Sequence, residues 1–228
     1  MNWLIYYPIE KFLSRFTDVL ITINQEDYHR AKSKFHAQSV EYVPGVGIDL
    51  EKIQDVNKNK ENLRKELKIL ENNKIIISVG ELSYRKNHQI VIKALKNINN
   101  VTYLICGQGE LKESLQNLAK SEGVDLRLLG FRKDVIELVK SSDMFVFPSL
   151  QEGLPVALME AMACKVPCIA SAIRGNEDLL EKENLYNPYS VEELKSKIQS
   201  GVVADYNMKK YDISNIKKKM KKIYGKEI

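Results

Sequence analysis

Two glutamates, Glu152 and Glu160, lie on either side of the start of a predicted helix. The apolar run Met144–Phe147 precedes them, so a strand, a turn and a helix are expected to follow one another. Pro155 suits the first helical position, where backbone N–H groups lack partners inside the helix and the positive end of the helix dipole attracts anions such as phosphate. The N–H groups expected there belong to Gly153, Leu154 and Val156. Glu160 follows about 7 Å further along the helix axis, where a carboxylate can accept hydrogen bonds from a diol.

Two adjacent cations, Arg85 and Lys86, follow another predicted strand, Lys74–Gly80. Because parallel strands end at a common edge of a sheet, we expect these cations opposite the loop that carries Glu152, in position to neutralise a diphosphate. The alternative for each of these residues alone is a solvated surface side chain. Asn87 or Ser83 is expected to cap the helix after the cations, and His88 is expected on its surface.

Strands and helices alternate through the middle of the chain, which predicts a Rossmann-like, doubly wound parallel sheet. The predicted strands are continuous apolar runs, typical of strands buried on both faces. They are Lys74–Gly80, Val101–Cys106, Val124–Leu129, Met144–Phe147 and Pro167–Ala170, with a weaker one at Asn184–Tyr186. The predicted helices are Glu61–Leu70, Asn87–Lys96, Gly109–Ser121, Arg132–Ser141, Pro155–Ala163 and Val191–Ser200. We therefore expect an α/β fold.

The two ends of the chain depart from this alternation and predict four parts. Residues 1–43 form a short βα appendage with too few elements for a core of its own, and residues 44–56 form a linker that opens on a Pro-Gly turn. Residues 57–205 form the α/β domain, and residues 206–228 contain a Lys-rich amphipathic helix. The predicted terminal elements are the helices Ile9–Phe16, Gln25–Phe35 (capped by Asn24) and Ile213–Tyr224, and the strands Asp18–Ile23 and Ser39–Val43.

Composition narrows the class of protein. Of 228 residues 44% are hydrophobic, enough for a substantial core, so intrinsic disorder is not expected. The net charge of +5 is concentrated in residues 206–228, which contain eight lysines and two acidic residues. Three cysteines match no zinc-site spacing and indicate buried thiols in a reducing cytoplasm. No apolar run approaches the ~20 residues that cross a bilayer, and no cationic leader of a signal peptide is present.

The string from Pro148 to Pro167 resembles the signature of retaining glycosyltransferases of family four, which have the GT-B fold. The matching motif is Pro-Ser-x-x-Glu-Gly-Leu-Pro with a second Glu eight positions after the first, followed by Ala-Met-Ala-Cys-Lys-Val-Pro. Residues 17–24 and 44–49 also resemble the end of the first GT-B domain and the start of the linker. The resemblance covers essentially the whole chain. It implies the C-terminal, donor-binding half of a GT-B fold with only the end of the N-terminal domain.

The resemblance also implies roles for individual residues at a nucleotide-sugar site. In that family the first Glu contacts the sugar, the second holds the ribose hydroxyls, and the backbone N–H groups between them bind the diphosphate. A Lys in the loop after the first strong strand binds the phosphates and matches Lys86, whereas Glu81 stands where the family has an Arg, so Arg85 is the candidate replacement. The implied catalytic residues are Lys86, Arg85 and Glu152, and the implied donor-binding residues are Glu160, Gly153, Leu154, Pro155, Val156, Gly80, Phe131 and Arg132.

Other loops carry weaker signals. Backbone around Phe131 and Arg132 is implied to read the base, with core packing and solvated charge as the equal alternative. Gly107-Gln108-Gly109 permits close backbone approach, yet a tight turn needs glycine for simpler reasons. Ser171–Asp178 is similar to the family's Gly-Gly-x-x-Glu loop but has one of the two glycines, and we assign it no catalytic role.

The implied reaction is metal-independent transfer of a hexosyl unit from a nucleotide sugar, with retention at the anomeric carbon. UDP is the expected nucleotide because it is frequent in the family, and the expected acceptor is a glycan or lipid-linked saccharide in surface polysaccharide synthesis. No metal, cofactor or nucleic-acid partner is expected, and the expected location is the cytoplasm, including the inner face of the membrane.

Two alternatives stay open. Because only about 43 residues precede the predicted linker, the first is a truncated or split nucleotide-sugar-binding module, inactive without an N-terminal domain on a partner chain. The second is a binding protein whose Lys-rich tail makes a peripheral contact with a membrane or with nucleic acid.

Overall fold

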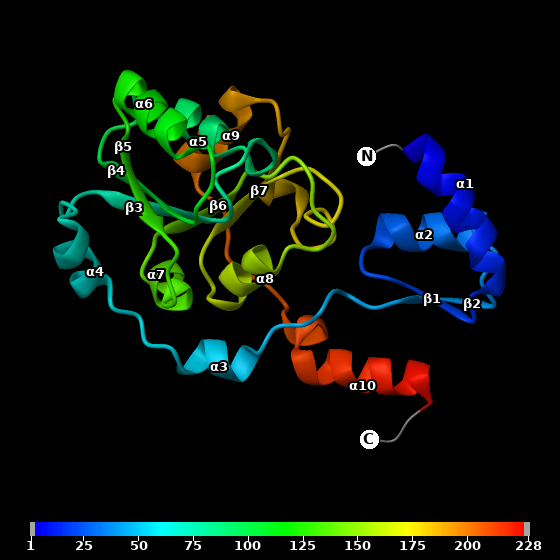
Figure 1. Cartoon of the computed structure of the whole chain (residues 1–228). Coiled ribbons are helices and arrows are strands. Elements are labelled where there is room, and N and C mark those ends of the chain that lie inside the picture. The colour runs from blue at the N-terminus through cyan, green and yellow to red at the C-terminus, as the bar shows by residue number, and fades with distance from the viewer. Residues whose placement is uncertain (1–2, 226–228) are drawn as a thin grey trace. The chain divides into compact units, whose positions relative to one another are not determined.

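The structure, a computed structural model, describes residues 3–225 of the 228-residue chain (Figure 1). The chain divides into two compact units. The terminal unit combines residues up to Asp49 with those from Lys209 onward, and the sheet unit comprises Leu50–Met208. The four-part division at residues 43, 56 and 205 stays a prediction.

The sheet unit is built on six parallel strands in the order β5-β4-β3-β6-β7-β8. They are β3 (Lys74–Val79), β4 (Val101–Cys106), β5 (Asp125–Gly130), β6 (Met144–Phe147), β7 (Cys168–Ser171) and β8 (Leu185–Tyr186). The chain first adds strands on one side of β3 and then, from β6 onward, on the other. This confirms the predicted doubly wound, Rossmann-like sheet, because the order reverses between β3 and β6.

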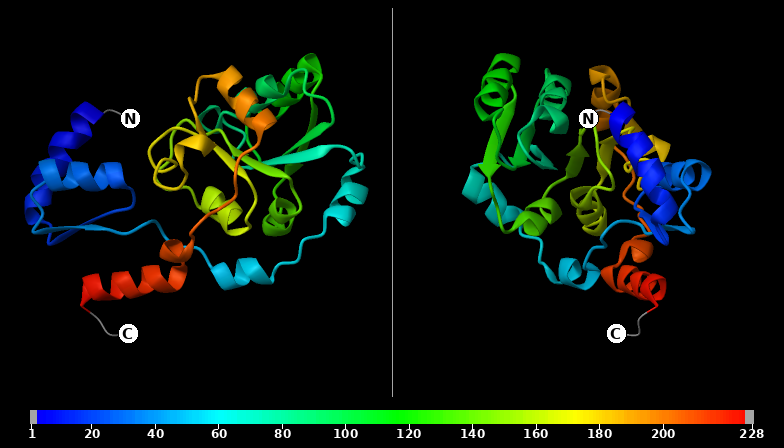
Figure 2. Two further views of the ribbon diagram at one scale, coloured as in Figure 1. Left: turned by 180° about the vertical axis from the view of Figure 1, so that it is seen from behind. Right: turned by 45° about the vertical axis from the view of Figure 1, so that its right-hand side comes forward.

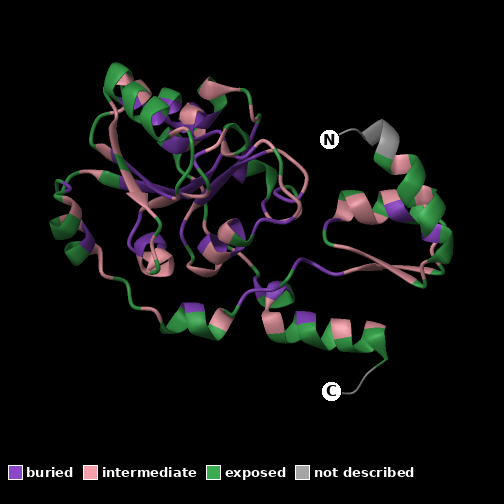
Figure 3. Cartoon of the chain, in the orientation of Figure 1, coloured by how far each residue is buried: buried purple, intermediate pink, exposed green. Residues whose placement is uncertain are grey.

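Helices cover both faces of this sheet (Figures 1 and 2). On one face α5 packs against α6 and α9, and on the other α8 packs against α3 and α7. The helices of the unit are α3 (Leu50–Asp55), α4 (Lys60–Leu67), α5 (His88–Leu95), α6 (Lys112–Glu122), α7 (Val135–Lys140), α8 (Val156–Ala163) and α9 (Val191–Ser200), with single 3-10 turns at Tyr84–Lys86 and Lys182–Asn184. Buried residues follow the strands and the inner helix faces (Figure 3), so the core lies on both sides of the sheet.

The terminal unit joins the two ends of the chain. It contains α1 (Trp3–Leu13), a 3-10 turn (Ser14–Phe16), β1 (Val19–Thr22), α2 (Gln25–Lys34), β2 (Ser39–Tyr42), a second 3-10 turn (Lys209–Tyr211) and α10 (Ile213–Tyr224). Strands β1 and β2 pair in parallel. The backbone of Ile48 donates to Tyr211 O at 2.9 Å and accepts from Ile213 N at 2.8 Å. Gly47 allows this approach, because a Cβ there would lie 2.8 Å from the Cα of Ile213.

Several local predictions are confirmed and others are wrong. Asn24 caps α2 by accepting from the Asp27 N–H at 2.8 Å, and α10 has the predicted bounds. The first helix was predicted to begin at Ile9, after Pro8, but it begins at Trp3 and contains Pro8. Neither Ser83 nor Asn87 caps α5 through its side chain. Asn87 instead adopts a left-handed conformation, with φ of 51°.

Candidate functional site

The predicted cations and carboxylate meet where the strand order reverses. The loop after β3 carries Arg85 and Lys86, the loop after β6 carries Glu152, and β3 and β6 are hydrogen-bonded neighbours. In open α/β sheets ligands bind outside the carboxyl ends of the strands at this switch point. The alternation of the sequence could place each loop at this edge, but the strand order decided that these two loops are adjacent.

Glu152 is the centre of the cluster. Its Oε1 atom accepts from Lys86 Nζ at 2.6 Å and from Ser149 Oγ at 2.6 Å, and it lies 3.4 Å from an Arg85 guanidinium nitrogen. The side chains of Glu152 and Lys86 are only 12% and 15% exposed, whereas that of Arg85 is 48% exposed. Lys86 Nζ also lies 5.0 Å from the centre of the Phe147 ring. Glu152 and Lys86 therefore form a shielded ion pair, with Arg85 at its solvent side.

Backbone contacts fix the two loops to each other. The Leu150 N–H donates to Arg85 O at 2.8 Å, and the Arg85 guanidinium donates to Gln151 O at 3.2 Å. On the other side, Ser171 Oγ donates to Ser149 O, and Asn176 Nδ2 donates to Ser171 O at 2.9 Å. These contacts cross-link the loops after β3, β6 and β7.

The loop Ser171–Asp178 packs against the turn before α8. Gly175 has a φ of 83°, and a Cβ on it would lie 2.2 Å from Gly153 O. Ser149, Ser171 and Asn176 are completely buried. None of the three was predicted as a site residue from the sequence. Only the position of Ser149, three residues before Glu152, could have indicated a role for the first of them.

The turn before α8 leads into an uncapped helix start. Pro155 is the residue before the first helical one, Val156, so the helix begins one position later than predicted. Pro155 offers no side-chain acceptor, and the first helical N–H bond joins Met159 N to Pro155 O. The N–H groups of 156–158 therefore have no partner within the helix. Leu154 and Pro155 are buried and Val156 is exposed, so Val156 marks the solvent side of the turn.

Glu160 lies one turn into α8 and is half-buried. Burial raises the pKa of its carboxyl above the ordinary value. Within the described part of the chain, this carboxylate has no hydrogen-bond or ion-pair partner. A partly desolvated carboxylate without a donor is unfavourable, and a ligand that brings hydroxyl donors would satisfy it.

The Gly80 loop rests on the glycine pair after β4. A Cβ on Gly107 would lie 1.8 Å from Gly80 O, and one on Gly109 would lie 2.4 Å from Leu82 O. The Gly80 N–H donates to Cys106 O at 3.0 Å. Packing therefore explains the Gly-x-Gly motif. The backbone at Gly107 and Gly109 approaches the backbone at Gly80 and Leu82 so closely that no side chain fits between them.

The two residues predicted to read the base lie at the end of β5, two strands away from β3. Phe131 is 74% exposed. The Arg132 guanidinium donates to both carboxylate oxygens of Asp134, at 2.8 and 2.6 Å, and to Glu66 Oε1 at 2.9 Å. These bonds raise the pKa of Arg132 above its ordinary value. In the described part of the chain, the hydrogen bonds of Arg132 go to Asp134 and Glu66 and not to Glu152 or Lys86. The base-reading role of Phe131 and Arg132 stays a prediction.

His88 is buried at 2% exposure, so the prediction of a surface position is wrong. It begins α5, and its Nδ1 lies 3.3 Å from Tyr103 Oη. Tyr103 Oη donates to Ser78 Oγ at 2.8 Å, and Ser78 donates to Val146 O at 2.5 Å. A polar network that crosses β4, β3 and β6 therefore lies beneath the Gly80 loop, and burial lowers the pKa of His88 to about 4.

The burial of His88 predicts acid sensitivity. Because the pKa of His88 is lower in the folded chain than in the unfolded chain, the unfolded chain binds more protons at acidic pH. The contribution of neutral His88 to the free energy of unfolding is therefore fully present above the unfolded-state pKa, and it is lost as the pH falls toward the folded-state pKa. With a folded pKa of about 4, lowering the pH from 7 to 5 is expected to remove about 2 kcal/mol from the free energy of unfolding. Urea titrations at both pH values measure it.

The matched variants for this measurement are His88→Gln and His36→Gln. His36 is exposed, so its replacement should retain the pH dependence, whereas His88→Gln should flatten it. Equal pH dependence in all three proteins would contradict a contribution from His88.

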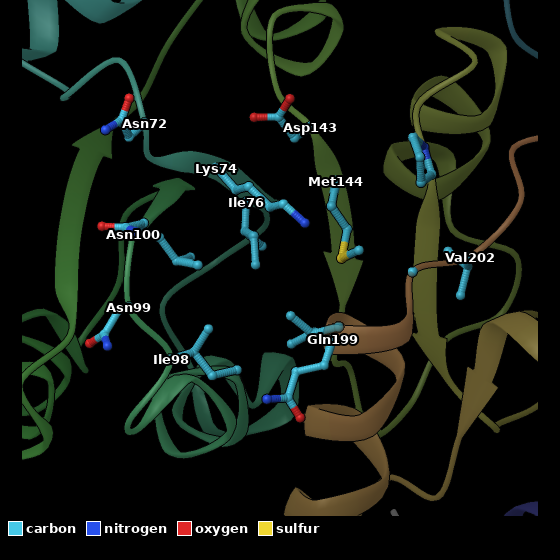
Figure 4. A pocket seen from close by; sticks show the side chains of 14 residues that line it. Asn72, Lys74, Ile76, Ile98, Asn99, Asn100, Asp143, Met144, Gln199 and Val202 are labelled. Carbon is cyan, nitrogen blue, oxygen red and sulfur yellow. The ribbon is translucent and has the colours of Figure 1, made fainter.

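A cavity of about 750 Å³ lies at the other edge of the sheet, at the amino ends of the strands (Figure 4). It holds none of the predicted site residues. Its polar side chains, such as Asn72, Lys74 and Asn100, lie on an exposed rim, and none of the buried polar atoms without partners lies in it. The cavity therefore gives no reason to move the candidate site from the carboxyl edge.

Within residues 3–225, no three His, Cys, Asp or Glu side chains gather in a way that could hold a metal ion, and no helix has the length and apolar character to cross a membrane.

The family model described as glycosyl transferases group 1 matches residues 59–219. An Escherichia coli UDP-Gal:alpha-D-GlcNAc-diphosphoundecaprenol alpha-1,3-galactosyltransferase is 35% identical over 196 residues, which cover 79% of this chain and 49% of the relative. The provisionally named glycosyltransferase EpsD of Bacillus subtilis (strain 168) is 34% identical over 187 residues, 78% of this chain and 49% of the relative. The chain thus spans about half the length of these curated relatives.

A solved structure with the same fold is that of Anabaena Alr3699/HepE in complex with UDP-glucose. It superimposes with a TM-score of 0.86 at 20% identity, over 99% of this chain and 68% of that one. At this identity the likeness concerns the fold.

Proposed function

The chain belongs to the glycosyl transferases group 1 family of GT-B enzymes, and on that premise we propose that its sheet unit binds the nucleotide-sugar donor of a retaining sugar transfer. The observation that carries the proposal is Glu160: a half-buried carboxylate with no partner among residues 3–225, one turn beyond an uncapped helix start. A nucleotide sugar offers what both features require, a diphosphate for the helix start and a ribose diol for the carboxylate.

Each residue of the site has a role in this proposal. Lys86, Arg85 and the N–H groups at the start of α8 stabilise the negative charge that develops on the departing diphosphate. Glu160 holds the ribose hydroxyls, and Glu152 orients the sugar. Because the two cations and the helix start supply positive charge where the leaving group forms, the transfer proceeds without a metal ion. Gly80, Phe131 and Arg132 line the base side of the donor.

We propose UDP as the nucleotide and a glycan or lipid-linked saccharide as the acceptor. The name of the Escherichia coli relative includes a UDP-linked galactose and a diphosphoundecaprenol-linked acceptor, which supports both choices. The product would then be a surface polysaccharide or its lipid-linked precursor, assembled at the inner face of the membrane.

Donor binding tests the proposal directly. UDP-glucose, UDP-galactose and UDP-N-acetylglucosamine are titrated in turn by ligand-observed NMR, and at least one is expected to bind. Glu160→Ala is expected to lower the affinity for that donor by ~30-fold, since hydrogen bonds to a charged group contribute about 1.5–3 kcal/mol.

The matched control is Glu137→Ala, which removes a partly buried glutamate from α7. This variant should bind as the unmodified protein does. Undiminished donor binding by Glu160→Ala would contradict the proposed site.

A further inference from the structure

Among residues 3–225, the partners of the Glu152 carboxylate all contact one of its two oxygens. Oε1 receives Lys86, Ser149 and Arg85. Oε2 has no hydrogen-bond or ion-pair partner among the residues that the structure describes, and it is not buried. The carboxylate therefore presents one neutralised oxygen to the cations and one open oxygen to a ligand.

The carboxylate of Glu152 therefore pairs with Lys86, the same cation that would bind a diphosphate. Lys86 Nζ lies 2.6 Å from Oε1, and both side chains are shielded from water, which strengthens their attraction. A diphosphate that approaches Lys86 meets a cation already paired, together with the negative charge of Glu152. Glu152 thus opposes the binding of the diphosphate by itself.

The carboxylate cannot easily turn away to relieve this opposition. Ser149 is completely buried, and its hydroxyl lies 2.6 Å from Oε1. The Ser149 carbonyl is in turn held by Ser171, and Ser171 by Asn176. A buried chain of hydrogen bonds from the loop after β7 thereby fixes the orientation of Glu152.

We propose that Glu152 is a specificity-determining residue that makes diphosphate binding conditional on an attached sugar. Oε1 weakens the attraction of Lys86 for any diphosphate, and Oε2 accepts a hydroxyl of the sugar, which restores affinity only when the sugar is present. The site then retains a UDP-sugar and releases UDP once the sugar has left. This inference rests on the proposed donor-binding function.

The test compares UDP with a UDP-sugar in the same protein. Isothermal titration calorimetry measures the affinities for UDP, inorganic diphosphate and the bound UDP-sugar from the NMR panel, with the unmodified chain and with Glu152→Gln. The unmodified chain is expected to bind the UDP-sugar more tightly than UDP. Glu152→Gln is expected to bind UDP and inorganic diphosphate ~10-fold more tightly than the unmodified chain, because one nearby negative charge is gone.

The control variant is Glu137→Gln on α7, which should leave all three affinities unchanged, because the hydrogen bonds and ion pairs of the Glu152 cluster described here do not include Glu137. Circular dichroism melts confirm that Glu152→Gln is folded, and Ser149→Ala, which retains the carboxylate but frees it, should bind UDP with an intermediate gain. If Glu152→Gln binds UDP no more tightly than the unmodified chain, while the latter binds a UDP-sugar, this inference is overturned and the proposed function stands. If the unmodified chain binds no UDP-sugar at all, the proposed function itself fails.

Discussion

Lys86→Ala is expected to lower the affinity for the bound UDP-sugar by about 100-fold or more. The variant loses the most shielded cation of the site, and charged hydrogen bonds contribute about 1.5–3 kcal/mol each. It also leaves Glu152, only 12% exposed, with Ser149 and the more distant Arg85 as its partners. The unpaired carboxylate then repels the diphosphate, so the two effects add in the same direction. Titration calorimetry with the UDP-sugar measures the loss.

A double variant separates the two contributions. Lys86→Ala/Glu152→Gln removes both charges and should recover part of the lost affinity, because the repulsion disappears while the missing cation does not return. Lys93→Ala, which removes an exposed lysine from α5, controls for a general change of charge and should bind normally. A single variant Lys86→Ala that binds within a factor of three of the unmodified chain would remove Lys86 from the site.

Gly107→Ala is expected to destabilise the sheet unit by about 3 kcal/mol or more. A Cβ at this position would lie 1.8 Å from Gly80 O and 2.7 Å from Gly80 C. Both atoms belong to the backbone at the end of the central strand β3, so no side-chain rotation relieves the overlap. The free energy of unfolding from urea titrations measures the effect.

Gly123→Ala is the matched control. Gly123 ends α6 with a φ of 69°, and nothing lies within 4 Å of a Cβ built there. Its replacement should therefore lower stability by only about 1 kcal/mol, from backbone conformation alone. Equal losses in the two variants would show that the contact between Gly107 and Gly80 is not tighter than an ordinary turn.

Most of the fold could be predicted from the sequence. The β-branched run at 74–79 has one physical interpretation, a strand buried on both faces, and the helical runs between such strands require parallel pairing. The helix after Pro155 was also predictable, because proline favours the start of a helix. Helix ends were predicted less accurately: the first helix begins at Trp3 instead of Ile9, and α3 (Leu50–Asp55) lies in the segment that the sequence predicted only as a linker. At Asn87 a side-chain cap was expected, but the residue adopts a left-handed backbone conformation instead.

His88 shows why burial was harder to predict than the elements themselves. Its neighbours in sequence, Asn87 and Gln89, are polar, so local pattern indicated an exposed helix start. In the folded chain its Nδ1 atom lies 3.3 Å from the hydroxyl of Tyr103, which belongs to β4. Local pattern contains no information about such a partner.

The sequence by itself determined which chemical groups are available: Glu152 and Glu160 on either side of a helix start, and two adjacent cations after a strand. The same motifs also identified the family. Tertiary structure alone decided how those charges combine. Lys86 and Glu152 are 66 residues apart in the chain, and they pair because β3 and β6 are neighbours in the sheet. Within the part of the chain that the structure describes, the same packing left Glu160 and the second oxygen of Glu152 without partners. Charge pairing depends on distance in space, and that distance is fixed by strand order and loop packing, which no local run of residues encodes.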